Sequence, residues 1–263
     1  MYSQEQVKEA TLEYFNGDEL ATNVFMTKYC LRDKKGNFME KTPDDMHKRI
    51  AKEFARMEDK FENSREEGTC AGNTYAHRSG PGLSETEIYS YLKDFKYIVP
   101  QGSPMMGIGN DYVNVSLSNC VVVDNPQDSV SSIMDAGKDL ANLFKRRCGV
   151  GLDISDLRPE GAPVNNSART TTGAWSFADF YSYVCRMIGQ NGRRGALMIS
   201  MDIRHPDIEE FIKMKQDLTK VTGANVSIKI SDSFMKAVEN SETFTLQFPV
   251  DADEPEYTAD IDA

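Results

Sequence analysis

Short apolar runs alternate with amphipathic segments from about Phe95 onward, and this alternation constrains the fold more than any other feature of the sequence. The apolar runs have the length of strands, and we expect strands at 97–99, 117–123, 150–154, 196–201, 224–230 and 244–248. The segments between them have helical periodicity, and we expect helices near 128–147, 174–188, 206–217 and 231–239. Successive strand–helix units require parallel strands, so the fold class is α/β, a sheet or barrel with functional loops at the carboxyl ends of the strands.

The preceding region is mostly helical and charged. "KTPDDMHKRIAKEFARMEDKF" has Thr42 as N-cap, Pro43 at the first helical position and apolar residues on one face. "SETEIYSYLKDF" begins with a Ser84/Glu87 capping box, and the Gly-rich stretch 66–82 between the two helices is predicted to be a loop. We therefore expect a helical region over 1–94 and an α/β domain over 95–250. The acidic ending 251–263, which has no basic residue, is expected to be a solvated tail or linker.

Composition excludes several classes of protein. The net charge of −11 and the absence of a long Lys/Arg block argue against a nucleic-acid partner. The cysteines are odd in number and form no C-x-x-C pair, which argues against a disulfide framework and a metal site; they are Cys30, Cys70, Cys120, Cys148 and Cys185. No apolar run approaches the roughly 20 residues of a membrane span, and the first residues do not resemble a signal peptide. We expect a cytoplasmic protein without a membrane partner.

Three segments are candidates for chemistry, and each has a plain structural alternative. In "SLSNCVVVDNPQDSV", Cys120 heads a β-branched run and is either core filling or a reagent. The loop "GQNGRRG" combines glycines with Arg193 and Arg194, so it either approaches a base or phosphate or is an ordinary connection with solvated arginines. In "RRCGVGLDISDLRPEGAPVNN", Gly149 is most simply a helix C-cap, and Cys148, like Cys185, is most simply a buried small hydrophobe.

Together these segments resemble the catalytic subunit of ribonucleotide reductase, from about Tyr14 to Phe248. The resemblance rests on several long blocks in order: "PQGSPMMGIGN", "SLSNCVVV", "KRRCGVGLDISDLRPEGAPVNN", "GQNGRRGALMISMDIRHPDIEEFIKMKQDLTKVTGAN" and "ISDSFMKAVE". It is strongest to the adenosylcobalamin-dependent (class II) diphosphate reductases. The implied fold is a helical region followed by the first half of a ten-stranded α/β barrel.

The resemblance implies reduction of ribonucleotides, as diphosphates, to deoxyribonucleotides by thiyl-radical chemistry with a cysteine pair as reductant. Cys120 matches the first reducing cysteine. Its partner and the radical cysteine of an Asn-Pro-Cys-Gly-Glu-like loop lie further along the family's chains, and neither motif occurs in this sequence. The implied partners are therefore the C-terminal part of the same reductase, which would bind most of the adenosylcobalamin, a thioredoxin-like or small dithiol reductant, and a second copy in a dimer.

Site residues carry over by position. Ser103, Asn119, Cys120 and Gly149 match substrate-binding positions, although many relatives have Ser at the position of Asn119. Positions that bind an allosteric deoxynucleotide or ATP are matched by Asp128, Arg158 and Asn165, the last in a first specificity loop over 161–169. The second specificity loop, which relays effector identity to substrate choice, is matched by Gln190, Asn191, Gly192, Arg193 and Arg194.

Two rival hypotheses remain. The chain could be a nucleotide-binding or assembly fragment without catalytic activity of its own, or an unrelated α/β protein whose glycines and cysteines are structural. His205 precedes Pro206 at a predicted helix start, where a capping or packing role is favoured over catalysis.

Overall fold

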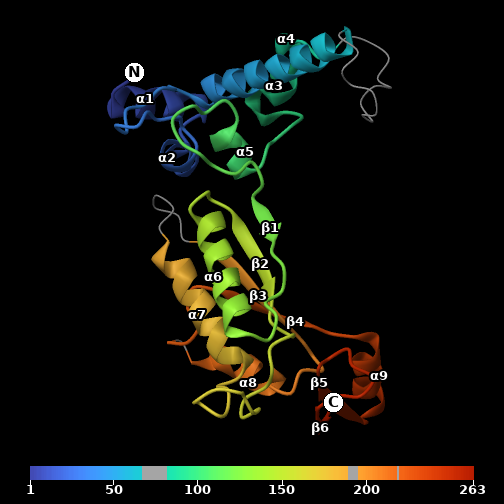
Figure 1. Ribbon diagram of the computed structural model, residues 1–263. Coiled ribbons are helices and arrows are strands. Elements are labelled where there is room, and N and C mark those ends of the chain that lie inside the picture. The colour runs from blue at the N-terminus through green and yellow to red at the C-terminus, as the bar shows by residue number, and fades with distance from the viewer. Residues whose placement is uncertain (67–81, 189–194, 218) are drawn as a thin grey trace. The chain divides into compact units, whose positions relative to one another are not determined.

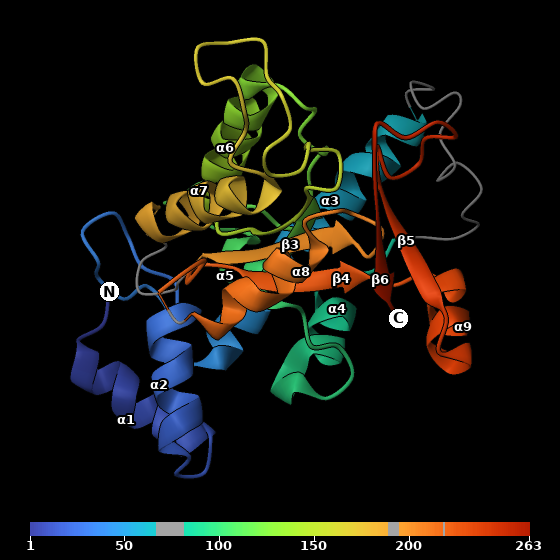
Figure 2. The same cartoon turned by 90° about the horizontal axis from the view of Figure 1, so that it is seen from below.

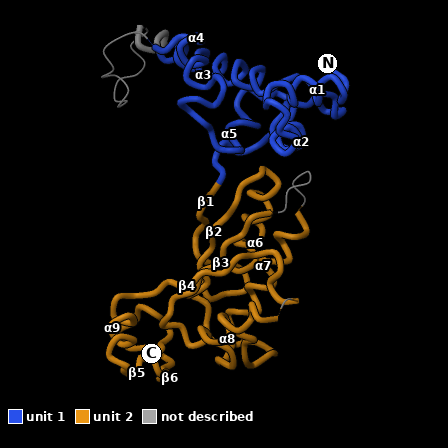
Figure 3. Tube along the Cα trace, turned by 180° about the vertical axis from the view of Figure 1, so that it is seen from behind, with its two compact units in different colours: residues 1–119 blue, residues 120–263 orange. Residues whose placement is uncertain are grey.

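The computed structural model describes residues 1–66, 82–188, 195–217 and 219–263 (Figure 1). The chain divides into two compact units, Met1–Asn119 and Cys120–Ala263 (Figure 3). This division falls later than the expected one at 94–95, because the segment after residue 95 is bonded to the helical unit: the Arg49 guanidinium donates to the carbonyl oxygens of Met105 and Ile108. The predicted loop at 66–82 lies almost wholly outside the described residues.

The first unit is helical, as predicted. Its elements are α1 (Gln4–Tyr14), α2 (Glu19–Lys28), α3 (Pro43–Glu66), α4 (Glu85–Leu92), the 3₁₀ turn η2 (Lys93–Phe95) and α5 (Gly102–Gly107). The Ser84/Glu87 capping box at the start of α4 is confirmed. The first half of α3 contributes to the core: Met46 and Ile50 are fully buried, whereas Phe54 is 45 % exposed.

The prediction of a strand at 97–99 is wrong. The amides of Tyr97 and Ile98 both donate to the carbonyl oxygen of Tyr91, so this segment closes the end of a helix. Asp94 and Phe95 before it have positive φ, and Pro100 after it has no N–H to donate, so the extended piece between them is too short to join a sheet.

The second unit contains the α/β region. Its elements are β1 (Cys120–Val122), α6 (Val130–Phe144), β2 (Gly149–Asp153), α7 (Ala174–Met187), β3 (Ala196–Asp202), α8 (Ile208–Lys213), the 3₁₀ turn η3 (Met214–Gln216), β4 (Asn225–Lys229), α9 (Asp232–Asn240), β5 (Thr243–Phe248) and β6 (Tyr257–Asp262). The first four strands are parallel, in the order β1-β2-β3-β4. The predicted α/β class is confirmed, while the described strands form an open sheet and not a closed barrel.

Alternate residues of these strands point to opposite faces, and one face carries the core. Figure 2 shows α6 and α7 on the same side of β3 and β4. The residues turned toward that side, such as Val150, Leu197 and Ile199, are at most 3 % exposed. The two helices approach closely because α6 has glycine at 137, where a Cβ would lie 2.7 Å from the Phe180 ring.

The acidic ending does not form the expected tail. β6 pairs antiparallel with β5 over six residues, from Thr243 opposite Asp262 to Phe248 opposite Tyr257. Its acidic side chains point outward, while Ile261 packs against the core of the unit. The charge pattern is therefore that of a strand with one solvated face, and β5 belongs to this hairpin rather than to the parallel sheet.

We predict that Ile261→Ala lowers the stability of the chain by about 1–3 kcal/mol, because it removes a partly buried side chain that anchors the hairpin. Thermal unfolding followed by circular dichroism measures this effect. Thr258→Ala on the exposed face of the same strand is the matched control and should change stability by less than about 0.5 kcal/mol. Equal melting of the two variants would restore the tail interpretation.

Candidate functional site

Cys120 lies on the open face of the sheet. It is the first residue of β1, opposite Gly149 of β2, which in turn is opposite Ala196 of β3. The Cys120 side chain is exposed, and Val122 beside it is 83 % exposed. Because Gly149 has no side chain, β2 does not cover the thiol at this position of the register. Gly149 is therefore a strand residue and not the helix C-cap that the sequence alone favoured; α6 ends at Phe144 with Lys145 as its C-cap, before Arg147 with φ +71°.

The other described cysteines are buried. Cys30, Cys148 and Cys185 are at most 8 % exposed, which confirms the packing role expected for the last two. Burial raises the pKa of Cys30 to about 12 and also raises the pKa of Cys185. Among these four thiols, Cys120 is thus the accessible one.

A polar group on the same face of the sheet was missed by the sequence analysis. The hydroxyl of Ser200 donates to Oδ2 of Asp153 at 2.6 Å, and Nζ of Lys229 lies 3.1 Å from the same oxygen. Burial raises the pKa of Asp153, but hydrogen bonds from Ser200 and Ser155 outweigh this effect and hold the pKa below its ordinary value. The sequence did contain a signal for this polar group, because its residues recur at alternate positions in otherwise apolar strands.

Ser103 and Asn119 come together within the first unit. The backbone N–H of Ser103 donates to Oδ1 of Asn119 at 2.7 Å, and Nδ2 of Asn119 donates to Oε1 of Gln101 at 2.7 Å. The Ser103 hydroxyl is fully buried and has no hydrogen-bond partner among the described residues. A buried hydroxyl without a partner costs about 1–3 kcal/mol.

Arg49 holds the α5 segment that carries Ser103. Its Nε lies 2.6 Å from Oε1 of Glu40, and both side chains are at most 10 % exposed. The remaining guanidinium nitrogens donate to Met105 and Ile108, while Oε2 of Glu40 accepts the N–H of Leu31 at 2.8 Å. Both charges are paired and bonded, as burial requires.

The three predicted effector residues line one pocket in the second unit. It has a volume of about 340 Å³, within the range of small-molecule sites, and Asp128, Arg158 and Asn165 all contribute to its wall. Nε of Arg158 donates to Oδ2 of Asp128 at 2.6 Å, and the Arg158 backbone N–H donates to Oδ1 at 3.3 Å. Both side chains remain about one third exposed, at 34 % and 28 %. The pair offers a guanidinium for an anion beside a carboxylate for a hydroxyl.

The loop 161–169 is closed by its own backbone. The N–H of Val164 donates to the carbonyl of Arg169 at 2.8 Å, and Pro163 and Thr170 form an antiparallel bridge. Arg169 adopts φ +66° at the turn. The residues expected to form the second specificity loop, Gln190–Arg194, lie outside the described part of the chain.

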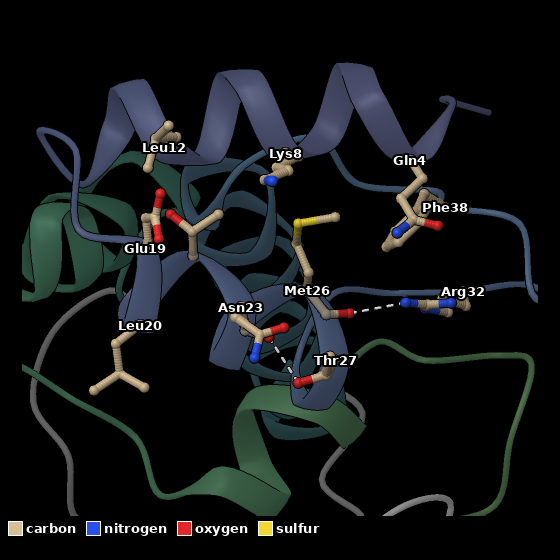
Figure 4. A pocket seen from close by; sticks show the side chains of 11 residues that line it. Gln4, Lys8, Leu12, Glu19, Leu20, Asn23, Met26, Thr27, Arg32 and Phe38 are labelled. Atoms are coloured by element: carbon tan, nitrogen blue, oxygen red, sulfur yellow. Dashed lines mark hydrogen bonds between the residues drawn. The ribbon is translucent and has the colours of Figure 1, made fainter.

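A further pocket lies between α1 and α2, and nothing in the sequence indicated it (Figure 4). Its volume is about 600 Å³, and Lys8 and Arg32 contribute positive charge to its lining. The Arg32 guanidinium is already engaged, because it donates to the Met26 carbonyl at 3.0 Å and lies 3.9 Å from the centre of the Phe38 ring. The pocket has no assigned ligand.

In the described ranges, no three His, Cys, Asp or Glu side chains gather as a metal site would require. The described helices include none that combines the length and the apolar character needed to cross a membrane.

We predict that alkylation distinguishes the described thiols. Iodoacetamide should modify Cys120 first, and Cys30, Cys148 and Cys185 more slowly by a factor of roughly 10² or more, since buried thiols react only after local opening. Peptide-resolved mass spectrometry of the folded chain gives each rate separately, so modification of Cys70 does not interfere. Modification of Cys120 at the rate of the buried thiols would show that the face is covered.

Comparison with known proteins gives two family matches that follow one another along the chain. Residues 15–111 match the family model described as the ribonucleotide reductase all-alpha domain, and residues 118–261 match the model of the ribonucleotide reductase barrel domain.

Named relatives agree with these matches. The vitamin B12-dependent ribonucleoside-diphosphate reductase of Mycobacterium tuberculosis is 29 % identical over 231 residues, which cover 87 % of this chain and 30 % of the relative. That of Thermoplasma acidophilum is 26 % identical over 270 residues, covering 87 % of this chain and 35 % of the relative. The ribonucleoside-diphosphate reductase large chain of Neurospora crassa is 30 % identical over 139 residues, covering 51 % of this chain and 15 % of the relative.

The chain thus spans about a third of the length of the first two relatives. The resemblance inferred from the sequence blocks is confirmed. Since the barrel model alone matches more than half of the 263 residues, this chain belongs to the ribonucleotide reductase large-subunit family.

Proposed function

We propose that this chain forms the helical region and the first parallel strands of a ribonucleotide reductase that converts ribonucleoside diphosphates to deoxyribonucleoside diphosphates. The observation that carries the proposal is the exposed Cys120 thiol at the start of β1, beside Gly149 on the open face of the sheet. Family membership supports the reaction class, and the named diphosphate reductases support the substrate class.

The reaction explains why a cysteine is needed at this position. Replacing the 2′-hydroxyl of the ribose by hydrogen breaks a C–O bond, forms a C–H bond and releases water. This change consumes two electrons and two protons, which two thiols supply when they close to a disulfide. Cys120 is the first of these thiols in our proposal, and its partner must bring its Cα within about 5.5–6 Å.

We propose that the second thiol and the radical cysteine come from further polypeptide. Cys148 and Cys185, the other cysteines of the second unit, are buried in its core. The open face around Cys120 leaves room for added strands, and we propose that the C-terminal part of the same reductase supplies them. A thioredoxin-like or small dithiol reductant would then reopen the disulfide, and the complete enzyme would act as a dimer in the cytoplasm.

Substrate binding is proposed for Ser103, Asn119, Cys120 and Gly149. The Ser103 hydroxyl, which has no hydrogen-bond partner among the described residues, can bond a ribose or phosphate oxygen. The Asn119 amide already bonds Ser103 and Gln101, and it retains one N–H and one lone pair for substrate. Asparagine bonds the two neighbours through separate atoms, Oδ1 to the Ser103 N–H and Nδ2 to Gln101.

Allosteric control is proposed for the pocket of Asp128, Arg158 and Asn165. A deoxynucleotide or ATP would place its phosphates on the Arg158 guanidinium and a sugar hydroxyl on the Asp128 carboxylate. The loop 161–169 forms part of the wall, and Gln190–Arg194 would carry the signal to the substrate base.

The relatives named vitamin B12-dependent support adenosylcobalamin as the radical source of the complete enzyme. That cofactor would supply the first hydrogen abstraction. Both described histidines, His47 and His205, are fully buried and offer no accessible ring nitrogen to a metal ion. We assign no residue of this chain to the cofactor.

A second candidate is a nucleotide-binding or assembly fragment without catalysis. One observation favours it: the pocket of Asp128 and Arg158 lies wholly in the second unit and does not need Cys120 to bind a nucleotide. Effector binding without deoxynucleotide formation in the reconstituted protein would select this candidate.

We predict that Cys120→Ser in the chain reconstituted with its C-terminal part abolishes multiple turnover with dithiol reductants, because a hydroxyl cannot form the disulfide. Stability should change by less than about 0.5 kcal/mol, since the side chain is exposed. The matched control, Cys185→Ser, buries a hydroxyl at a cost of about 1–3 kcal/mol but should keep turnover. Deoxynucleotide formation and thermal melting are the two measurements. Sustained turnover by the Cys120 variant would end the reductant assignment.

We also predict that Arg158→Ala weakens deoxynucleotide binding by about 1.5–3 kcal/mol, the loss of a charge-assisted phosphate contact. Isothermal titration calorimetry measures the affinity. Lys138→Ala removes the same charge from the exposed side of α6, outside the pocket lining, and should bind effector normally. An unchanged affinity in the Arg158 variant would remove this pocket from the effector hypothesis.

A further inference from the structure

The turn after β3 contains two buried polar residues that the proposed reaction does not use. His205 is fully buried and Asp207 is 7 % exposed, and both lie just before α8. From the sequence, His205 was expected to cap or pack a helix start. The structure shows that both side chains bond a distant segment, the one that forms the wall of the effector pocket.

The Asp207 carboxylate joins the two ends of that segment. It accepts the backbone N–H of Glu160 at 3.0 Å and 3.1 Å on its two oxygens, and its Oδ2 accepts the N–H of Ala174 at 3.0 Å. Ala174 is the first residue of α7, so the carboxylate also lies at the positive end of that helix. One buried carboxylate thus fixes the chain on both sides of the loop 161–173.

His205 bonds the backbone of Asp207 and fixes a third point of the segment. Its Nδ1 accepts the N–H of Asp207 at 3.0 Å, which leaves Nε2 protonated and donating to the Leu157 carbonyl at 2.7 Å. Burial lowers the pKa of His205, which favours the neutral ring that this pair of bonds requires. The turn therefore holds Leu157, Glu160 and Ala174 together.

Gly173 is adapted to the same contact. Its φ of +85° is a conformation that favours glycine, and a Cβ at this position would lie 2.7 Å from Oδ2 of Asp207 and 2.9 Å from the Cβ of Glu160. Any side chain here would push the carboxylate away from the N–H groups that it accepts.

The loop between these fixed ends supplies the pocket. Asn165, Asn166 and Thr171 line it, and Arg158 lies between two of the bonded positions, Leu157 and Glu160. We propose that Asp207, whose backbone N–H is bonded by His205, is a positioning residue that sets the shape of the effector pocket without touching the effector. The effect on nucleotide binding rests on the effector site proposed above, whereas the anchoring of the loop does not.

The single tryptophan of the chain is a built-in reporter of this anchor. Trp175 follows Ala174, and its Nε1 donates to Oε2 of Glu160 at 3.2 Å. Release of Glu160 or Ala174 from the carboxylate would change the surroundings of the indole. Tryptophan emission therefore reports on the loop in the absence of any ligand.

The test uses Asp207→Asn, which keeps the size of the side chain but turns one acceptor oxygen into a donor that faces the Glu160 N–H, and removes the negative charge from the bonds that remain. We expect a shifted Trp175 emission in the ligand-free chain and a rise of roughly tenfold or more in the dissociation constants of dATP, dGTP and dTTP, since charge-assisted bonds are lost. Glu209→Gln, an exposed change on α8, is the charge control and should alter neither readout. Ile199→Val, a cavity in the core of β3, controls for lowered stability and should leave the dissociation constants unchanged.

Two further measurements apply if Asp207→Asn does not fold. Gly173→Ala attacks the contact from the loop side and should give the same shifted emission and weakened binding. In the unmodified chain, hydrogen exchange should show the amides of Glu160 and Ala174 protected relative to that of Ala168 at the loop tip.

The outcomes separate the anchor from the effector site. Shifted emission with weakened binding in the variants supports the positioning role. Normal binding despite shifted emission, or unprotected amides at Glu160 and Ala174, overturns it. If the unmodified chain binds none of the three nucleotides, the effector site and the role of Asp207 in it both fail, while protected amides still establish the anchor itself.

Discussion

The register of the parallel sheet is the constraint on which the second unit depends. Val121, Val150 and Leu197 share one level of β1, β2 and β3 on the face covered by helices, and the residues before them, Cys120 and Gly149 among them, share the other face. A slip of one residue would exchange the two faces, burying the thiol and exposing the apolar side chains. Hydrophobic burial on one side therefore determines that Cys120 is accessible on the other.

Buried polar contacts hold in place the segments that carry the proposed site residues. In the first unit, the Arg49–Glu40 pair holds the segment that carries Ser103. In the second unit, Asp207 holds the segment that carries the effector residues. Each side chain bonds backbone groups of a distant segment, and leaving such buried partners unpaired would cost several kcal/mol. The loops are consequently held by a few polar residues on the core elements beneath them.

The fold was predictable where a local pattern controls it. Apolar runs located four parallel strands, and the Ser84/Glu87 spacing located the start of α4. The hairpin of β6 was missed because its acidic residues were interpreted as a tail, although their alternation with apolar residues fits a strand with one solvated face. The role of Asp207 left no local signal, since its partner Glu160 lies 47 positions away. Family resemblance found Cys120 and Arg158, but tertiary geometry was needed to find what positions them.

We propose that Cys120 is a reductant, and the oxidation state of its sulfur after a single turnover tests this role. The reconstituted protein would be reduced, freed of external dithiol, supplied with one ribonucleoside diphosphate and quenched with an alkylating agent. Mass spectrometry of the peptide containing Cys120 then measures disulfide against alkylated thiol. We expect one disulfide at Cys120 for each deoxynucleotide formed. Deoxynucleotide formed while Cys120 remains a free thiol would contradict it.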